Sequence, residues 1–202
     1  MVPLEAGASP DNPPCPACSE PLFGWLAPQP GLAGAVSRCE SCGLGVVGGE
    51  PDPQEALLEL DRLREGEGLR IASRDSFAAA LGNAGWAGLT PGSRYLFTVE
   101  SVRCLIARRD QVVTSCRWLP GASIMATWGT LLNSVTFGHN IALAALRGNT
   151  IAAPAAKRWQ RRIDALASTV LAIPAMIIAV PIELAGGVFR RGAVLRLRLQ
   201  LL

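Results

Sequence analysis

Four cysteines in two close pairs are the residues whose types and spacing point most directly to chemistry. Cys15 and Cys18 form one Cys-x-x-Cys pair, and after twenty intervening residues Cys39 and Cys42 form a second. Two residues between thiolates allow both members of a pair to reach one tetrahedral metal ion at about 2.3 Å. Gly43 directly follows the second pair, where a left-handed backbone angle is usually needed.

This spacing predicts a zinc ribbon in which Cys15, Cys18, Cys39 and Cys42 bind one structural Zn²⁺. Two symmetric pairs that leave no open coordination position favour zinc over an iron–sulfur cluster, and a structural role over a catalytic one. Two unrelated redox pairs, or four buried thiols, are the alternative interpretation. Binding of the ion would fold a segment that has little apolar core of its own.

The charges are divided unevenly along the 202 residues. Residues 1–68 hold three Arg and eleven Asp or Glu, a balance of −8, whereas residues 69–202 have a balance of +11. Half of all residues are apolar and 17% are charged, which excludes a disordered tail, a coiled coil and a disulfide-rich secreted miniprotein. The acidic balance around the cysteines also opposes binding to nucleic acid.

The start of the chain has neither a basic segment nor an apolar run, so we expect no signal peptide and a flexible arm over residues 1–12. The cysteines are then expected in a reducing compartment, where paired thiols more often bind metal than form disulfides. Cys104 and Cys116 lie among apolar residues and are expected to be buried.

Periodicity in the middle of the chain predicts several elements. Apolar residues at helical spacing predict an amphipathic helix over residues 54–64, and Thr98 is a good N-cap for a helix over residues 99–109. Strands are expected over residues 69–73, 112–119 and 193–201, where side chains alternate in polarity or form short apolar runs.

Several of these segments resemble class I S-adenosylmethionine-dependent methyltransferases that carry a zinc ribbon. The similar stretches are CPAC…CESCGLGVVGGEPDP, EALLELDRLREGEGLRIASRDSF and GSRYLFTVESVRCLI, and the last two strands of the family sheet resemble QVVTSCRWLPG and GAVLRLRLQ. The resemblance implies an α/β sheet, S-adenosylmethionine as cofactor and methyl transfer. Only eleven residues separate Cys42 from Gln54, where the family has its first four strands and its cofactor loop. The chain therefore resembles a shortened form without the cofactor-binding half.

The last third of the chain is strongly apolar. Residues 165–182 carry no charge over eighteen positions, which as a helix would extend about 27 Å, just short of the ~30 Å hydrocarbon layer. Residues 122–146 are also apolar but contain Thr and Asn, and basic residues flank the charge-free run at 157–162 and 190–198. A spanning helix, an interfacial or re-entrant hairpin, and a buried helix at a core or oligomer interface all fit this pattern.

The histidine and three tryptophans in or near this part of the chain each have a structural interpretation as well as a functional one. His139, the one histidine, is more readily a packing residue than a base or metal ligand. Trp118, Trp128 and Trp159 fit either a membrane interface or an aromatic core. No catalytic residue is assigned from the sequence.

Together these observations predict a shortened α/β fold: a zinc ribbon, then a Rossmann-like C-terminal half with a hydrophobic helical insertion. The expected divisions are residues 1–12, 13–50, 51–121, 122–189 and 190–202. The expected function is a non-catalytic, zinc-binding protein on the cytoplasmic side of a membrane, bound to lipid or docked on a protein partner. The alternative is a methyltransferase that uses S-adenosylmethionine on a lipid-linked or membrane-bound acceptor.

Overall fold

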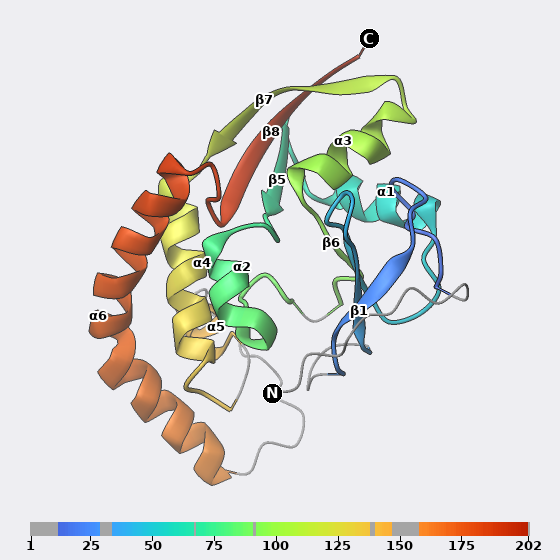
Figure 1. Cartoon of the computed structure of the whole chain (residues 1–202). Helices are drawn as coiled ribbons and strands as arrows, with labels where there is room; N and C mark the ends of the chain where they lie inside the picture. The colour runs from blue at the N-terminus through green and yellow to red at the C-terminus, as the bar shows by residue number, and fades with distance from the viewer. Residues whose placement is uncertain are drawn as a thin grey trace. The chain divides into compact units, whose positions relative to one another are not determined.

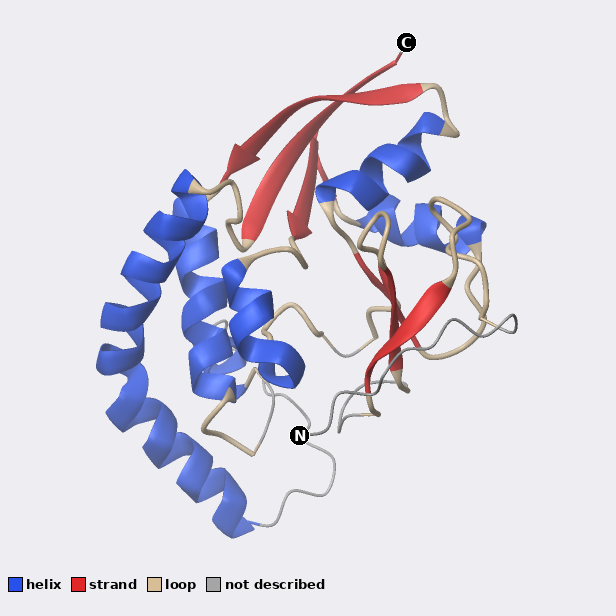
Figure 2. Ribbon diagram, viewed as in Figure 1, coloured by secondary structure: helices blue, strands red, loops and turns tan. Residues whose placement is uncertain are grey.

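The computed structural model describes residues 12–28, 34–66, 68–90, 92–137, 140–146 and 158–201 (Figure 1). The chain forms two units from segments that alternate along the sequence. Unit 1 contains Met1–Asp75, Pro91–Arg117 and Leu195–Leu202, and unit 2 contains Ser76–Thr90 and Trp118–Val194. The strands belong to unit 1 almost entirely, while unit 2 is built from helices (Figure 2).

The first sheet of unit 1 has the order β1-β2-β3-β6 and is antiparallel throughout. Its strands are β1 (Leu22–Leu26), β2 (Val36–Cys39), β3 (Gly45–Val47) and β6 (Tyr95–Leu96). Val46 pairs with Tyr95 and Gly45 with Leu96, so a strand from the middle of the chain completes the sheet that follows the cysteines. The first fifty residues therefore do not form this sheet alone.

The second sheet has the order β4-β5-β8-β7, formed by β4 (Arg64–Glu65), β5 (Gly68–Ala72), β8 (Val194–Leu201) and β7 (Gln111–Trp118). Three of these strands, β5, β7 and β8, were expected from the sequence, and β7 and β8 are neighbours in the sheet. Gly68 allows close contact in this sheet, because a Cβ there would lie 2.7 Å from the carbonyl oxygen of Leu197.

Two helices complete unit 1, and both begin at side-chain caps. Helix α1 (Pro53–Arg62) starts after Asp52, whose side chain accepts a hydrogen bond from the Gln54 N–H. Helix α3 (Val99–Ala107) starts after Thr98, which forms a capping box with Ser101. Both helices lie where periodicity predicted them, and the predicted N-cap at Thr98 is confirmed.

Unit 2 contains α2 (Phe77–Gly82), the short 3₁₀ helix η1 (Asn83–Gly85), α4 (Pro120–Asn133), α5 (Ile141–Leu146) and α6 (Arg158–Val188). Helix α4 lies along α6 (Figure 1), and their contact forms the core of the unit around Trp128, Leu132, Ala175 and Ala179. Thr127, in the middle of α4, meets Glu183 late in α6, whereas Phe137, just beyond the end of α4, meets Asp164 early in α6, so the two helices are antiparallel.

The expected fold class is confirmed in its coarse form. The chain mixes helices and strands, its four paired cysteines lie together, and helices occupy the expected hydrophobic insertion. The Rossmann-like part of the expectation is not confirmed, because both sheets are antiparallel. The expected flexible arm, apart from Asn12, lies outside the described residues.

Candidate metal centre and apolar helix face

The four paired cysteines come together at one place in unit 1. Their sulfur atoms all lie within 4.8 Å of one another. The Cys15 and Cys42 sulfurs are 3.6 Å apart, and those of Cys18 and Cys39 are 3.4 Å apart. Four sulfurs at 2.3 Å from one tetrahedral ion would be separated by about 3.8 Å. The cluster could therefore hold a metal ion and is consistent with zinc.

The two Cys-x-x-Cys turns have the same backbone structure. In each, the N–H of the first cysteine donates to the carbonyl five residues later, at 2.7 Å from Cys15 and 2.8 Å from Cys39. The N–H four residues later donates back to the first cysteine, at 2.9 and 3.0 Å. The residue four positions after the first cysteine has a left-handed φ in both turns, 69° at Ser19 and 74° at Gly43. Two equivalent turns thus point their thiols at one centre.

The sulfurs influence one another electrostatically. The hydrogen bond between the Cys15 and Cys42 sulfurs lowers the pKa of Cys15 to about 5 and raises the pKa of Cys42. Burial raises the pKa of the Cys18 thiol to about 11. Backbone N–H groups of Cys18 and Ala17 also stabilise the Cys15 thiolate. Because thiolates are the metal-binding form, a cation bound here displaces protons from the cluster.

A residue distant in sequence supports the second turn. The Thr98 hydroxyl donates to the Cys42 carbonyl at 2.6 Å and accepts from the Ser101 N–H at 3.0 Å. A Cβ at Gly43 would lie 2.8 Å from the Thr98 methyl carbon, so glycine is required there by space as well as by its φ. The N-terminus of α3 therefore fits directly against this turn.

Two arginine side chains donate hydrogen bonds to backbone carbonyl groups of the cysteine turns. Arg108, at the C-terminal end of α3, donates to the Ala17 carbonyl at 3.3 Å, and Arg74 donates to the Gly43 carbonyl at the same distance. Arg74 also lies over the Trp25 ring, 4.4 Å from its centroid. These contacts could not be predicted from sequence patterns, since each joins segments more than thirty residues apart. Helix α3 thus contacts one turn at each of its ends.

The second candidate feature is the surface of α6. Its segment Arg162–Val188 is, among the described residues, the one helix long and apolar enough to cross a membrane, and only 11% of its most apolar stretch is buried. Large apolar side chains recur at intervals of three, four or seven residues on one side, which we call the outer face: Ile163, Leu166, Val170, Ile173, Ile177, Leu184 and Val188. Ile173 is 72% exposed and Val188 is 80% exposed. These exposed side chains lie together along one side of the helix and are not scattered singly over the surface.

The opposite side of α6 carries small and polar residues, and it is buried. This inner face comprises Asp164, Ala175, Ala179, Glu183 and Gly186. Glu183 accepts hydrogen bonds from the Thr127 hydroxyl and from the Ala193 N–H. Asp164 accepts from the Phe137 N–H at 2.8 Å. Glu183, which ends the charge-free run in the sequence, thus points inward, and the outer face continues past it.

The three tryptophans considered as interface anchors differ in environment. Trp128 is a core residue that donates to the Ala172 carbonyl at 2.8 Å. Trp118 is partly buried, with its ring against Gly187 and Gly192. Trp159 is 51% exposed and stacks edge-to-face on Phe137 at 5.7 Å. Only Trp159 therefore remains in an environment suited to a membrane interface.

Three further expectations concern single residues. The expected burial of Cys104 and Cys116 is wrong: Cys104 is partly buried, and Cys116 is exposed because it lies on β7, the edge strand of its sheet. His139 and Lys157 lie outside the described residues.

Comparison of this chain with protein-family models, with curated proteins and with solved structures gives no match.

Proposed function

We propose that the chain is a non-catalytic, membrane-associated protein whose cysteine cluster is the structural zinc site of a zinc ribbon. The observation that carries the proposal is the inverted polarity of α6, with carboxylates inside and large aliphatic side chains outside. A helix on the surface of a water-soluble protein has the opposite arrangement. An aliphatic outer face is favourable when it contacts the apolar acyl chains of lipid.

The metal part of the proposal rests on two equivalent turns with four sulfurs and no other ligand type. A site of four thiolates has no open position for substrate, so its contribution is to folding. Strands β1, β2 and β3 extend from these turns, as expected of a ribbon, and β6 is added to them. Since paired cysteines that bind a metal are typical of a reducing compartment, we place the protein there, on the cytoplasmic face of the membrane.

The membrane part rests on the area that the outer face leaves exposed. Burying a Leu, Ile or Val side chain is favourable by about 1.5–3 kcal/mol relative to leaving it in water. Seven such residues on one helix face together give a driving force comparable to the net stability of a whole domain. A bilayer removes this area from water; a protein partner docked on the same face would do so too, and the experiment below separates the two.

Flotation with lipid vesicles tests the proposal. The full chain is mixed with vesicles of phosphatidylcholine containing phosphatidylglycerol, and we expect it to float with them. Replacing both Ile173→Asp and Ile177→Asp on the outer face should weaken binding on the order of a hundredfold or more, because two buried aliphatic side chains are lost.

The matched control carries the same charge change elsewhere. Leu58→Asp with Leu81→Asp alters two leucines that are 59% and 60% exposed but lie on α1 and α2. This variant should float like the unmodified protein. A wild-type chain that remains in the vesicle-free fraction contradicts membrane binding, and an outer face that instead forms a protein contact would show as a stable oligomer of the wild type.

One observation favours a second candidate function, methyl transfer to a lipid-linked or membrane-bound acceptor. Strands β7 and β8 are neighbours, as the closing strands are in the methyltransferase family that the sequence resembles. The glycine-rich stretch 82–88, however, forms the end of α2 and η1, and its glycines serve close contact with α4 and Trp86. Calorimetric titration with S-adenosylmethionine tests this candidate, and saturable binding of one equivalent would favour it over the first.

A further inference from the structure

We infer that α6 lies in the plane of one membrane leaflet and does not cross the bilayer, with arginines at both of its ends on anionic lipid headgroups. This inference rests on the proposed membrane association and adds its geometry, which the sequence left open between spanning and interfacial. Three observations within the described residues support it.

The first observation is where the helical insertion begins and ends. It leaves from β7 and returns into β8, and these strands are neighbours in one sheet. Within unit 2 the chain also doubles back, because Thr127 of α4 meets Glu183 of α6 and Phe137 meets Asp164. Both ends of the insertion therefore lie on the same side of any membrane. A single crossing is excluded by this connectivity, and zero or two crossings remain.

The second observation concerns α4. If α6 crossed the bilayer, α4 would have to supply the second crossing. It has fourteen residues, about 21 Å of helix against a hydrocarbon layer of about 30 Å. Only Pro120 and Gly121 among its residues are exposed. It is covered partly by η1 and its flanking loop, since Asn133 donates to the Gly85 carbonyl and the Ala87 N–H donates to Thr130.

Two crossings would consequently carry this loop into hydrocarbon together with α4. Irregular backbone exposed to lipid leaves polar groups unsatisfied, at a cost of several kcal/mol for each group, so the loop belongs at the aqueous side. Unit 2 then has one face for lipid, the outer face of α6. A single apolar face along a helix is the arrangement of an in-plane membrane helix.

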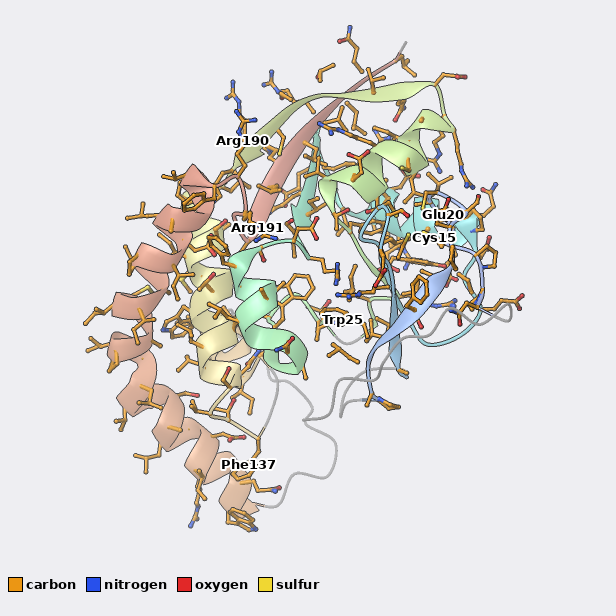
Figure 3. All side chains as sticks on the ribbon, in the orientation of Figure 1. Cys15, Glu20, Trp25, Phe137, Arg190 and Arg191 are labelled. Atoms are coloured by element: carbon orange, nitrogen blue, oxygen red, sulfur yellow. The ribbon has the colours of Figure 1, made fainter. Side chains whose placement is uncertain are left out.

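The third observation is the symmetry of the two ends of α6. Arg162 is exposed near its start, and Arg190 and Arg191 are exposed just after its end. Aromatic pairs lie at the same places: Phe137 with Trp159, and Phe77 with Phe189 at 6.2 Å. Arg191 lies over the Phe77 ring at 5.5 Å. Figure 3 shows Phe137 at one end of α6 and Arg190 and Arg191 at the other.

This symmetry fits an in-plane helix better than an inserted one. In the plane of a leaflet, both arginine groups reach phosphates of the same surface, and both aromatic pairs lie at headgroup depth. The outer face between them is about 38 Å long from Ile163 to Val188 and points uniformly toward the acyl chains. The partner is therefore a leaflet rich in anionic lipid.

Depth measurement along α6 tests the inference. Single cysteines are introduced as Leu166→Cys, Ile173→Cys, Ile177→Cys or Leu184→Cys, in the full metal-loaded chain carrying C104S and C116S. Each is given a nitroxide, and collisions with oxygen and with a water-soluble nickel chelate report its depth in phosphatidylglycerol-containing vesicles. We expect all four labels at one shallow depth, about 5–10 Å below the headgroups. A label at Leu58→Cys on α1 should report water.

Other depth profiles have distinct meanings. Labels at 173 and 177 near the bilayer centre, with 166 and 184 shallow, would overturn the in-plane geometry while leaving membrane association intact. Labels that broaden one another, with little oxygen contact, would assign the outer face to a second copy of the chain and also overturn it. Failure of the unmodified chain to float would instead contradict the proposed function itself.

The arginines provide an independent readout. Replacing Arg162, Arg190 and Arg191 by Gln should weaken binding to anionic vesicles by on the order of fivefold for each residue replaced. Binding to purely zwitterionic vesicles should be unchanged. Equal loss on both kinds of vesicle would contradict the headgroup contacts.

Discussion

Thr98 shows at the scale of one residue how the cysteine site depends on groups outside it. Its hydroxyl is buried, caps α3 through the Ser101 N–H and donates to the Cys42 carbonyl. The change Thr98→Val removes both bonds and leaves the Cys42 carbonyl buried without this donor. We expect a loss of about 1–3 kcal/mol in the free energy of unfolding, measured by denaturant titration of the metal-loaded chain.

Thr98→Ser is the control for this prediction. Serine keeps the hydroxyl and both hydrogen bonds and removes only the methyl group that faces Gly43. It should stay within about 1 kcal/mol of the unmodified protein. If the valine and serine variants were equally destabilised, the methyl contact rather than the hydrogen bonds would be the source of the effect.

The residues of the site were predictable from the sequence only in part. The spacing of Cys15, Cys18, Cys39 and Cys42 predicted the cluster, because ligands two residues apart are a local constraint. The left-handed φ predicted after the second pair is confirmed at Gly43. The equivalent φ at Ser19 was missed, since serine rarely adopts it. The supporting arginines were missed because their partners are fixed by tertiary structure alone.

At the scale of elements, α6 departs from its sequence pattern in an instructive way. The sequence defines a charge-free run over residues 165–182, whereas the helix extends over Arg158–Val188 and its apolar outer face continues to the end. Hydropathy along a sequence does not show which way a side chain points from its helix. Glu183 therefore interrupted the charge-free run in the sequence, although its side chain lies on the buried inner face. Its hydrogen bond from Thr127 turns it inward, and that contact depends on α4 lying alongside.

The turn between α6 and β8 supports a prediction about close packing. A Cβ added at Gly192 would overlap the indole ring of Trp118, and one added at Gly187 would lie 2.7 Å from the same ring. Gly192→Ala should therefore cost about 1–3 kcal/mol in the free energy of unfolding, because the ring has to shift in a packed site. The shift can be followed in the near-ultraviolet circular dichroism of the protein.

Gly121→Ala is the matched control for Gly192→Ala. Nothing lies within 4 Å of a Cβ at Gly121, which is an exposed residue in the first turn of α4. Alanine should raise helix stability there by up to about 1 kcal/mol. Similar losses in both variants would contradict the assigned role of the Trp118 contact.

At the scale of the whole molecule, each of the two units is assembled from separate stretches of chain. Local patterns predicted most helices and three of the four strands of the second sheet, yet the pairing of β3 with β6 joins segments about fifty residues apart. Strand β6 has two residues, too few for any periodicity to show. Division into consecutive ranges from composition therefore could not anticipate that unit 1 includes α3, β7 and the end of β8.

This arrangement has a consequence for metal removal. Because α3, β6 and Arg74 all contact the cysteine turns or the sheet that follows them, loss of the ion should loosen unit 1 as a whole and not only the first fifty residues. Trp25 is the one tryptophan of unit 1, and the other four belong to unit 2. The Trp25 ring lies against Arg74, and Arg74 donates to the Gly43 carbonyl beside the cysteine cluster. We therefore expect the fluorescence of Trp25 to report on the metal centre.

We therefore expect a strong chelator to shift the emission of the unmodified protein to longer wavelength in proportion to the zinc released. The Trp25→Phe variant retains an aromatic ring for Arg74 and should show almost no shift, because its remaining tryptophans lie in unit 2. Restoring zinc should reverse the change. An equal shift in both proteins would mean that the ion also maintains unit 2. Emission that ignores both chelator and zinc would contradict a structural metal site, because removing such an ion removes the link between the two cysteine turns.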